Sequence, residues 1–239
     1  MVKVEHLVKR YGQNYAVNDI SFEINEGEIV GLLGPNGAGK STTMNILTGY
    51  LSSTSGTAEI GGINILEHPI EAKKLIGFLP EQPPVYQDMT VDEYLNFVYE
   101  LKGCKLDREA HLNDIINTVR IADVRKRLIR NLSKGYKQRV GIAEALVGDP
   151  KLIVFDEPTV GLDPNQIIEI RKLIKTLGKQ RTVILSSHIL PEVADVCEKV
   201  IIIDHGNIVA QDSLANLQKG IGESSVLSVR IAGGENSVL

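Results

Sequence analysis

The stretch Gly34-Pro35-Asn36-Gly37-Ala38-Gly39-Lys40-Ser41-Thr42 decides the fold of this chain of 239 residues. It holds a glycine, four further residues and then Gly-Lys-Ser, the pattern of a phosphate-binding loop. Glycine makes up about 7% of an average protein, so the pattern occurs by chance on the order of once per hundred chains of this length. The apolar run 28–33 before it is typical of a buried strand, and residues 41–47 after it of a helix start. A phosphate-binding loop requires this order of strand, loop and helix.

The residue types in the loop suit a triphosphate. Backbone N–H groups can wrap round phosphates only where glycines leave room, and the N-terminus of the following helix is positive. Lys40 is expected to reach the β and γ phosphates, and the Ser41 hydroxyl to bind magnesium. The alternative is a glycine-rich turn before an ordinary helix. The phosphate-contacting residues predicted here are Gly34, Pro35, Asn36, Gly37, Ala38, Gly39, Lys40, Ser41 and Thr42.

The composition is that of an ordinary globular protein, with 43% hydrophobic and 23% charged residues. A net charge of −4 argues against a protein that coats nucleic acid, because such proteins are usually basic. No apolar run approaches the roughly 18 to 20 residues of a membrane span, and the N-terminus does not resemble a signal peptide. Cys104 and Cys197 lack metal-ligand spacing. We therefore expect a cytoplasmic α/β protein with reduced thiols, either one domain or one domain with an insertion.

The residues before the loop are predicted to form strands. Val2, Val4 and Leu7 indicate a first strand, and residues 20–24 alternate apolar and polar side chains as a half-buried strand does. Residues 9–12 are predicted to form a turn. Tyr11 in that turn can stack on a purine, but its position alone favours an ordinary surface tyrosine.

Strand signals disappear between residue 81 and about residue 150. Thr90 and Glu93 form a capping box before apolar residues at helical spacing, and Asp107 can cap a second helix. Ser133 is a good N-cap for a third helix, whose lysines and free N–H groups make its start a weak candidate for an anion site. The region of about 82–150 is predicted to be a helical insertion.

A run of positive charge lies within this insertion, without an intervening acid. It is either a solvated basic face or a surface that attracts nucleotide phosphates or an anionic membrane. The sequence leaves both interpretations open. The run consists of Arg125, Lys126, Arg127, Arg130, Lys134, Lys137 and Arg139.

Two predicted strand ends carry the remaining candidate residues. The apolar strand 152–155 runs into Asp156 and Glu157, and buried carboxylates at that position are costly unless they hold a cation or take part in chemistry. Asp156 is the candidate for holding magnesium, and Glu157 for orienting or deprotonating an attacking water. His188 follows another buried strand, 182–186, and stands where α/β sheets bind ligands. A lone histidine is more often structural, but this position favours a functional one.

The C-terminal part is predicted to end the domain. Residues 200–203 and 208–210 indicate a final strand pair. Residues 220–239 are predicted to be a linker and the start of a possible appendage, so the main domain is expected to cover residues 1–219.

In this order the motifs resemble those of the ATP-binding subunit of an ATP-binding-cassette (ABC) transporter, over about residues 2–219. The resemblance implies a P-loop ATPase core with an antiparallel β subdomain and an inserted α-helical subdomain. It implies a head-to-tail dimer with two ATP molecules and Mg²⁺ at the interface. Tyr11 would then stack on adenine, which reverses the interpretation above, and Val17 would lie beside the base or ribose.

Further roles follow from the same resemblance. Residues 132–136, Leu-Ser-Lys-Gly-Tyr, match the signature motif, usually Leu-Ser-Gly-Gly-Gln, so Ser133 and Gly135 would contact the γ-phosphate bound to the opposite subunit. Asp156 and Glu157 match the magnesium-binding aspartate and the catalytic glutamate. His188 matches the switch histidine that senses the γ-phosphate. Lys40, Glu157 and His188 are therefore the predicted catalytic residues, and residues 161–163 match the loop that crosses the dimer.

The chain departs from the family pattern at two places. Lys134 and Tyr136 replace the usual glycine and glutamine, but the serine and second glycine are kept, so we expect activity to survive. The family's glutamine that links magnesium to the helical subdomain falls at Glu81. A carboxylate there can still bind magnesium but adds negative charge beside a triphosphate, so we expect Glu81 to alter metal or ATP affinity.

The resemblance predicts an ATPase that powers transport, of the kind found in gliding-motility, multidrug or polysaccharide exporters with a separate permease. The expected partners are a second ABC ATPase subunit and a permease docked near residues 81–94 at the cytoplasmic face of the membrane. The alternative is a soluble ABC-type ATPase acting on nucleic acid or ribosomes. Those relatives usually carry two cassettes, zinc-binding cysteines or a long coiled coil, so no nucleic acid is expected here. A kinase would need an acceptor site, and residues 132–136 favour a dimeric cassette instead.

Overall fold

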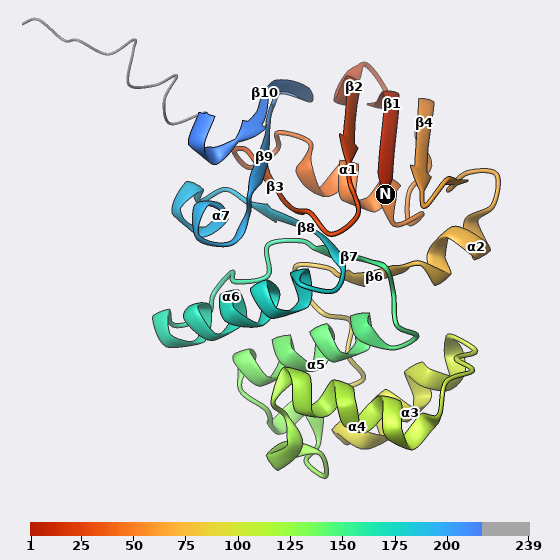
Figure 1. Cartoon of the computed structure of the whole chain (residues 1–239), viewed down its shortest axis with the longest axis vertical. Helices are drawn as coiled ribbons and strands as arrows, with labels where there is room; N and C mark the ends of the chain where they lie inside the picture. The colour runs from red at the N-terminus through yellow and green to blue at the C-terminus, as the bar shows by residue number, and fades with distance from the viewer. Residues whose placement is uncertain (217–239) are drawn as a thin grey trace, which may run out of the picture.

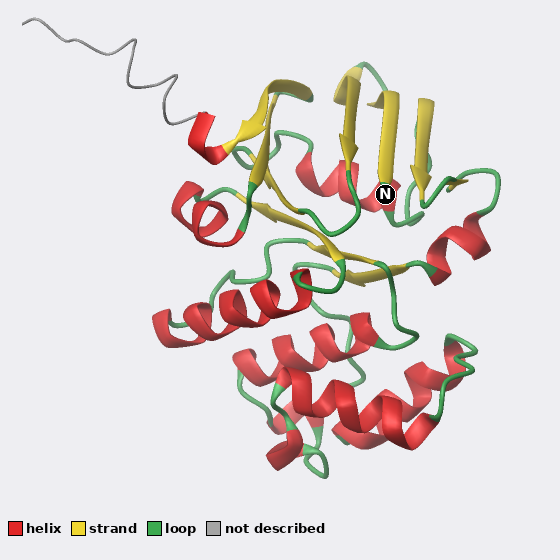
Figure 2. Ribbon diagram, viewed as in Figure 1, coloured by secondary structure: helices red, strands yellow, loops and turns green. Residues whose placement is uncertain are grey.

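Residues 1–216, which the computed structural model describes, form two β-sheets with helices between and below them (Figure 1). The predicted linker and appendage at 220–239 lie outside the described residues. Figure 2 shows the strands gathered in the upper half of the view and a layer of helices in the lower half.

The first sheet is antiparallel and contains the N-terminus. Its strand order is β2-β1-β4-β5, from β1 (Val2–Tyr11), β2 (Asn14–Ile24), β4 (Ser55–Ile60) and β5 (Ile63–Asn64). The turn predicted at 9–12 is wrong in its position, because β1 continues to Tyr11 and pairs it with Asn14. Register shifts along the β1–β2 ladder and a positive φ of 49° at His6 let the strand bend and continue. These irregularities break the alternation by which the strand would be recognised.

The second sheet has the order β10-β9-β3-β8-β7-β6, and all of its pairs are parallel except β9–β10. The central strand β3 leads into the phosphate-binding loop, so the loop lies at the carboxyl edge of the sheet, where α/β proteins bind ligands. The carboxyl ends of β7 and β8 meet the same edge. The strands are β3 (Ile29–Leu33), β6 (Ile76–Leu79), β7 (Leu152–Phe155), β8 (Thr182–Ser187), β9 (Lys199–Asp204) and β10 (Asn207–Ser213).

The helices occupy three places. Helix α1 (Lys40–Leu47) lies behind the first sheet, α2 (Pro69–Lys74) connects β5 to β6, and α6 (Pro164–Gly178) and α7 (Leu190–Val196) cover the lower face of the second sheet (Figure 1). Between β6 and β7 the chain forms only helices: α3 (Val91–Leu101), α4 (Arg108–Val119), α5 (Lys134–Leu146) and the 3₁₀ turns η1 (Ala122–Val124) and η2 (Ile129–Asn131). Thr90 caps α3 through the predicted capping box.

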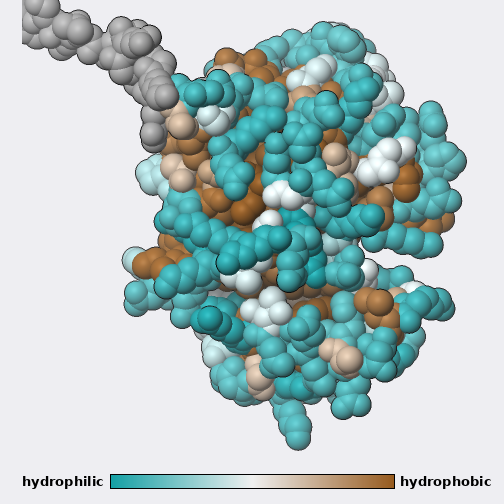
Figure 3. Space-filling model, viewed as in Figure 1, coloured by the Kyte–Doolittle hydropathy of each residue, from teal (hydrophilic) through white to brown (hydrophobic). Residues whose placement is uncertain are grey.

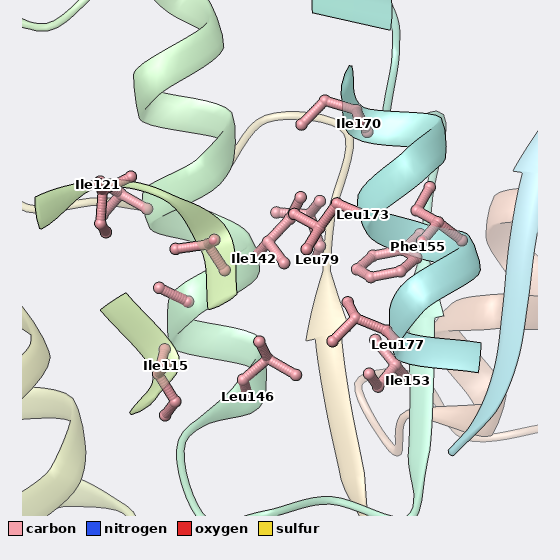
Figure 4. Close-up of a cluster of buried hydrophobic side chains, with 14 of the residues drawn as sticks. Leu79, Ile115, Ile121, Ile142, Leu146, Ile153, Phe155, Ile170, Leu173 and Leu177 are labelled. Atoms are coloured by element: carbon pink, nitrogen blue, oxygen red, sulfur yellow. The ribbon is translucent and has the colours of Figure 1, made fainter. Parts of the chain in front are cut away.

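The second sheet is buried on both faces, which explains its continuous apolar strands. In β7, Leu152 and Val154 pack into the core shared with the first sheet, whereas Ile153 and Phe155 point into the core below. This alternation follows from the period of two along a strand. Figure 4 shows the lower core, in which Phe155 packs with Leu173 and Leu177 of α6. The sheet is therefore packed between two apolar layers, which fix the position of its carboxyl edge.

The molecular surface in the same view is mainly hydrophilic, with small separate apolar patches (Figure 3). No helix within residues 1–216 has the length and hydrophobicity needed to cross a membrane. Of the two cysteines, Cys197 is buried, and burial raises the pKa of its thiol. A protonated, buried thiol of this kind is chemically inert.

Candidate nucleotide-binding and catalytic site

The phosphate-binding loop joins β3 to α1, and two of its glycines, Gly34 and Gly39, are required by the packing. Gly39 has φ of 111°, and a Cβ added there would lie 2.4 Å from the Ala16 carbonyl oxygen. A Cβ at Gly34 would lie 2.1 Å from the Ile203 carbonyl oxygen. Any larger residue would push the loop away from its neighbours, because both contacts are with backbone atoms.

Lys40 is buried at the first position of α1, with its side chain folded back across the loop. Its ammonium group donates hydrogen bonds to the carbonyl oxygens of Gly34 at 2.8 Å and Pro35 at 3.1 Å. It also lies 3.7 Å from Glu157 Oε1. A buried charge needs such partners, and here they hold a cation at the place where the loop would receive phosphate oxygens.

Asp156 stands at the end of β7 and is buried. Its Oδ1 accepts hydrogen bonds from the hydroxyls of Ser186 at 2.5 Å and Ser41 at 3.2 Å. The Glu157 N–H in turn donates to the Ser186 hydroxyl at 2.9 Å. Thus α1, β7 and β8 are joined through one carboxylate, and the predicted pair of Ser41 and Asp156 does come together.

This pair fits a magnesium ion. Among residues 1–216, no group of three or more His, Cys, Asp or Glu side chains could hold a metal on its own. Mg²⁺ usually keeps several waters and is bound by one or two carboxylates together with substrate phosphates, so it does not need such a group. The Ser41 hydroxyl and the Asp156 carboxylate are two adjacent oxygen donors beside the phosphate-binding loop.

Glu157 and His188 meet at the same edge. Glu157 is buried and has a φ of 48°, an uncommon conformation for a side chain other than glycine and one that is often found at functional sites. His188 Nδ1 lies 3.1 Å from both carboxylate oxygens of Glu157. An ionised carboxylate can only accept hydrogen bonds, so the contact places the imidazole proton on Nδ1. The contact fixes the orientation of both side chains at this edge of the sheet, because the two groups are in direct hydrogen-bond contact.

A cleft of about 170 Å³ opens over the phosphate-binding loop and reaches Glu157, whereas Asp156 and His188 do not line it. Glu81, at the end of β6, lies in its wall together with Lys40 and Glu157. Glu81, which was predicted to lie beside the triphosphate, therefore shares this cleft with the phosphate-binding loop. The full lining is Ala16, Asn36, Gly37, Gly39, Lys40, Ser41, Thr42, Glu81 and Glu157.

The predicted position of Val17 needs correction. Its side chain is buried in the core between the two sheets, because it faces inward from β2. The neighbouring Ala16 lines the cleft and touches the loop through its carbonyl group. Successive strand residues point to opposite faces, so a shift of one position exchanges a core residue for a site residue.

Tyr11 lies outside the lining of the cleft. Tyr11 is 53% exposed at the end of β1, and the Lys9 ammonium lies 5.3 Å from the ring centroid. An exposed aromatic face beside a cation is available for stacking.

Ser133 and Gly135 also lie outside the lining of the cleft. Ser133 caps α5 by accepting a hydrogen bond from the Tyr136 N–H at 3.4 Å. A Cβ at Gly135 would lie 2.6 Å from the Gln166 side chain, and one at Gly161 would lie 2.1 Å from the Lys134 ammonium. The start of α5 therefore packs against the loop 161–163 and α6. Within one chain the structure does not bring these two residues to the phosphate-binding loop.

The basic run in the insertion is partly neutralised. Ion pairs join Arg125 to Asp92 at 2.8 Å, Arg130 to Asp88 at 2.9 Å and Arg139 to Glu169 at 2.5 Å. These pairs favour the solvated basic face over a phosphate-binding or membrane-binding surface. Their acidic partners come from distant parts of the sequence, so inspection of the run alone does not reveal them.

Sequence reasoning missed four residues that support the site: Ala16, Ser186, Gln138 and Glu192. Gln138 on α5 is buried and donates to the Pro158 carbonyl oxygen at 2.8 Å. The sequence feature that could have identified the polar ones is a polar side chain inside an apolar segment, as with Ser186 near the end of β8. Such residues have to be explained, because an unpaired buried polar group is costly.

A family model described as "ABC transporter" matches residues 17–160. The chain is 38% identical over 220 residues to the uncharacterized ABC transporter ATP-binding protein YxlF of Bacillus subtilis (strain 168), covering 92% of this chain and 73% of the relative. It is 35% identical over 237 residues to the linearmycin resistance ATP-binding protein LnrL of the same strain, covering 98% and 76%. It is 37% identical over 221 residues to the bacitracin transport ATP-binding protein BcrA of Bacillus licheniformis, covering 92% and 72%.

Among solved structures, the chain is similar to the ATP-binding cassette MJ0796 in a dimeric, post-hydrolysis state bound to ADP and Pi. The TM-score is 0.80 at 27% identity, covering 90% of this chain and 99% of the other. These comparisons define the class of protein: a P-loop ATPase cassette. The chain belongs to the ABC transporter family, as an ATP-binding subunit that hydrolyses ATP to power transport. The predictions of family, fold class, function and enzymatic activity are thereby confirmed.

Proposed function

We propose that this chain works as a pair with a second ABC ATPase subunit, most simply a second copy, and drives export through a separate permease at the cytoplasmic face of the membrane. The observation that carries the proposal is the convergence of Lys40, Asp156, Glu157 and His188 at the carboxyl edge of one sheet. Export is supported by the relative LnrL, which is named as a resistance protein.

The size of the cleft supports the pairing. Its volume of about 170 Å³ is below the roughly 300–1,000 Å³ usual for small-molecule sites, which is consistent with an ATP site completed by a second subunit. Ser133 and Gly135 lie outside this cleft, at the N-terminus of a helix whose free N–H groups suit an anion. In the proposed dimer they face the γ-phosphate held by the partner subunit. MJ0796 is a dimeric cassette of the same fold.

Each predicted residue then has a role within one composite site. The loop residues 34–42 surround the phosphates, and Lys40 neutralises the β and γ phosphates. Ser41, Asp156 and Glu81 would hold Mg²⁺, which when bound offsets the negative charge of the triphosphate. Glu157 orients and deprotonates the attacking water, and His188 holds Glu157 and contacts the γ-phosphate. Tyr11 stacks on the adenine, and Ala16 in place of Val17 lies beside the ribose.

Dimerisation can be tested with Glu157→Gln, which should bind ATP but hydrolyse it very slowly. We expect this variant to form a stable dimer with Mg-ATP and to remain monomeric with ADP, as measured by light scattering after size-exclusion chromatography. Adding Ser133→Arg to the same chain should abolish the dimer while ATP binding persists, because the change lies on the surface assigned to the partner's phosphate. Dimers that form equally with ATP and with ADP, and that persist in the Ser133→Arg variant, would contradict the composite site.

The permease can be tested with the same variant. Glu157→Gln, purified with ATP from detergent-solubilised membranes of its own organism, should bring a multi-span membrane protein with it. A chain carrying Lys40→Ala as well serves as the matched control, because it should not bind ATP. Ribosomes or nucleic acid in place of a membrane protein would favour the soluble ABC-type ATPase.

A further inference from the structure

Glu192 is a buried carboxylate that the proposed mechanism does not use. It lies on α7 (Leu190–Val196), which follows His188 after a single intervening residue, and it is 8% exposed. Burying a carboxylate is costly unless hydrogen bonds and a cation compensate for the lost water. Its partners therefore indicate what the structure gains from it.

Three groups compensate Glu192. Its Oε2 accepts hydrogen bonds from the Thr159 hydroxyl at 2.7 Å and the Ser187 hydroxyl at 3.1 Å. Its Oε1 lies 3.4 Å from Arg171 Nη2 of α6. Thr159 and Ser187 are themselves buried, so these hydrogen bonds are shielded from water.

The two hydroxyls belong to the segments that carry the predicted catalytic pair. Thr159 comes two residues after Glu157, and Ser187 comes directly before His188. Ser187 also accepts the Ile189 N–H at 3.1 Å, which closes the turn around His188. A single carboxylate thus holds both segments together.

A purely structural role for Glu192 would be to attach α7 to α6. Other ion pairs already join these two helices, because Asp195 of α7 lies 2.9 Å from Lys175 and 3.8 Å from Arg171 of α6. The helix contact would not require the two hydroxyls, which bind Glu192 to the loop after β7 and to the end of β8, not to α6. The loop after Glu157 is held from a further side, since Gln138 of α5 donates to the Pro158 carbonyl oxygen at 2.8 Å.

We propose that Glu192 is a positioning residue for ATP hydrolysis, which sets the spacing of Glu157 and His188 by holding Thr159 and Ser187. The proposal rests on the catalytic roles of Glu157 and His188 given under the proposed function. Glu192 touches neither substrate nor metal, so its effect is on turnover and not on nucleotide binding.

The main test removes the two hydroxyls and preserves the shape, with the double variant Thr159→Val and Ser187→Ala. We expect its kcat to fall on the order of 10- to 100-fold, because catalysis is sensitive to displacements of about 1 Å, while KM for ATP stays within about twofold. Glu192→Ala should show the same division between kcat and KM. Glu192→Gln should keep more activity than Glu192→Ala, since its amide oxygen still accepts a hydrogen bond.

Asp195→Asn is the matched control. It removes a carboxylate from the same helix that also faces Arg171, but it does not touch Thr159 or Ser187. We expect wild-type turnover from it, even if its melting temperature falls as far as that of the double variant. Loss of kcat in proportion to lost thermal stability across all these variants would overturn the proposal, because that is the result of a structural role.

Two failures can be told apart. If the folded double variant turns over ATP within about twofold of wild type while Glu157→Gln and His188→Ala are inactive, Glu192 does not position the pair and the proposed function stands. If Glu157→Gln itself turns over at the wild-type rate, the catalytic assignment fails, and the role of Glu192 fails with it.

Discussion

The Nδ1 atom of His188 lies 3.1 Å from each of the two carboxylate oxygens of Glu157. The two residues follow different strands, β8 and β7, and are separated by 31 positions in the sequence. Parallel strands that lie side by side end at the same edge of a sheet, and this brings the pair together. The carboxylate contacts the Nδ1 side of the imidazole, so Nε2 is not engaged by Glu157.

His188→Ala should reduce kcat for ATP hydrolysis by about 10²- to 10³-fold, the cost of removing one positioned polar group from a transition state. The reason is that Glu157 loses its orienting partner and the γ-phosphate loses a contact. ATP affinity should change little, because Lys40 and the loop are intact. Phosphate release under saturating ATP measures the first quantity, and equilibrium titration with ATP the second.

His68→Ala is the control for that variant, since His68 is an exposed histidine paired with Glu71 at the start of α2. It should retain wild-type turnover. A His188 variant with unchanged kcat would show that the histidine is structural.

Glu81→Gln should bind metal-free ATP more tightly, because it removes a negative charge from the wall of the cleft. The Mg²⁺ concentration for half-maximal turnover should rise, since an amide oxygen is a poorer ligand for magnesium than a carboxylate. Both can be measured by titration of ATPase activity with magnesium and by ATP binding in the presence of a chelator. Gln82→Ala is the control, as Gln82 is exposed and does not line the cleft. Unchanged ATP affinity and turnover in Glu81→Gln would leave Glu81 without a functional role.

Gly39→Ala should abolish ATP binding and lower the melting temperature, because the added Cβ would lie 2.4 Å from a backbone oxygen at a φ of 111°. Gly37→Ala separates the two causes, since Gly37 has a φ of 81° but nothing within 4 Å of an added Cβ. That variant should lose only about 1–2 kcal/mol of stability from backbone strain. Thermal melts and ATP titrations of the two variants test this, and an equal effect at both sites would contradict the packing argument.

Tyr11→Ala should raise KM for ATP about tenfold, since stacking of a base on an aromatic ring contributes about 1–3 kcal/mol. Tyr11→Trp should restore most of the affinity, because stacking requires only an aromatic face. Tyr15→Ala is a close control: this tyrosine on the neighbouring strand is 52% exposed, against 53% for Tyr11, and also has a cation beside its ring. Equal KM values for the two alanine variants would remove Tyr11 from the ATP site.

The stability of the chain should decrease in acid because of His111. The Gly148 N–H donates to His111 Nε2 at 3.1 Å, which requires a neutral imidazole, and burial lowers the pKa of His111 below its ordinary value of 6.5. A group with a lowered pKa in the folded state stabilises the protein above its unfolded pKa, and this contribution is lost as the pH falls through the folded pKa. Wild type should therefore lose stability as the pH falls below the ordinary histidine pKa of 6.5.

His111→Gln isolates this contribution, because the amide oxygen can accept the same N–H and does not titrate. The loss of unfolding free energy on acidification, measured by urea denaturation, should be smaller in the variant than in wild type. The same loss in both proteins would assign the acid sensitivity to other groups.

The local sequence determined much of this protein. The loop 34–42 and the apolar runs before Asp156 and His188 predict these strands and the edge where the site forms, because each signal lies within one turn or one strand. The capping box at Thr90 and the N-caps at Asp107 and Ser133 likewise predict helices that the structure contains. These features depend on neighbouring residues, which a sequence displays directly.

The tertiary structure alone decided which side chains meet. Val17 lies in the core and Ala16 lines the cleft, the reverse of what was expected for Val17. The register of β1 against β2 shifts at bulges, and a shift of one residue turns a side chain to the opposite face. The partners of Arg125, Arg130 and Arg139 lie about 30 to 40 positions away, so the charge run could not reveal them. Glu192 is an ordinary helix residue in the sequence. Only the packing of α7 against β8 and the loop after β7 buries its carboxylate between Thr159 and Ser187, because contacts between distant segments are set by the fold as a whole.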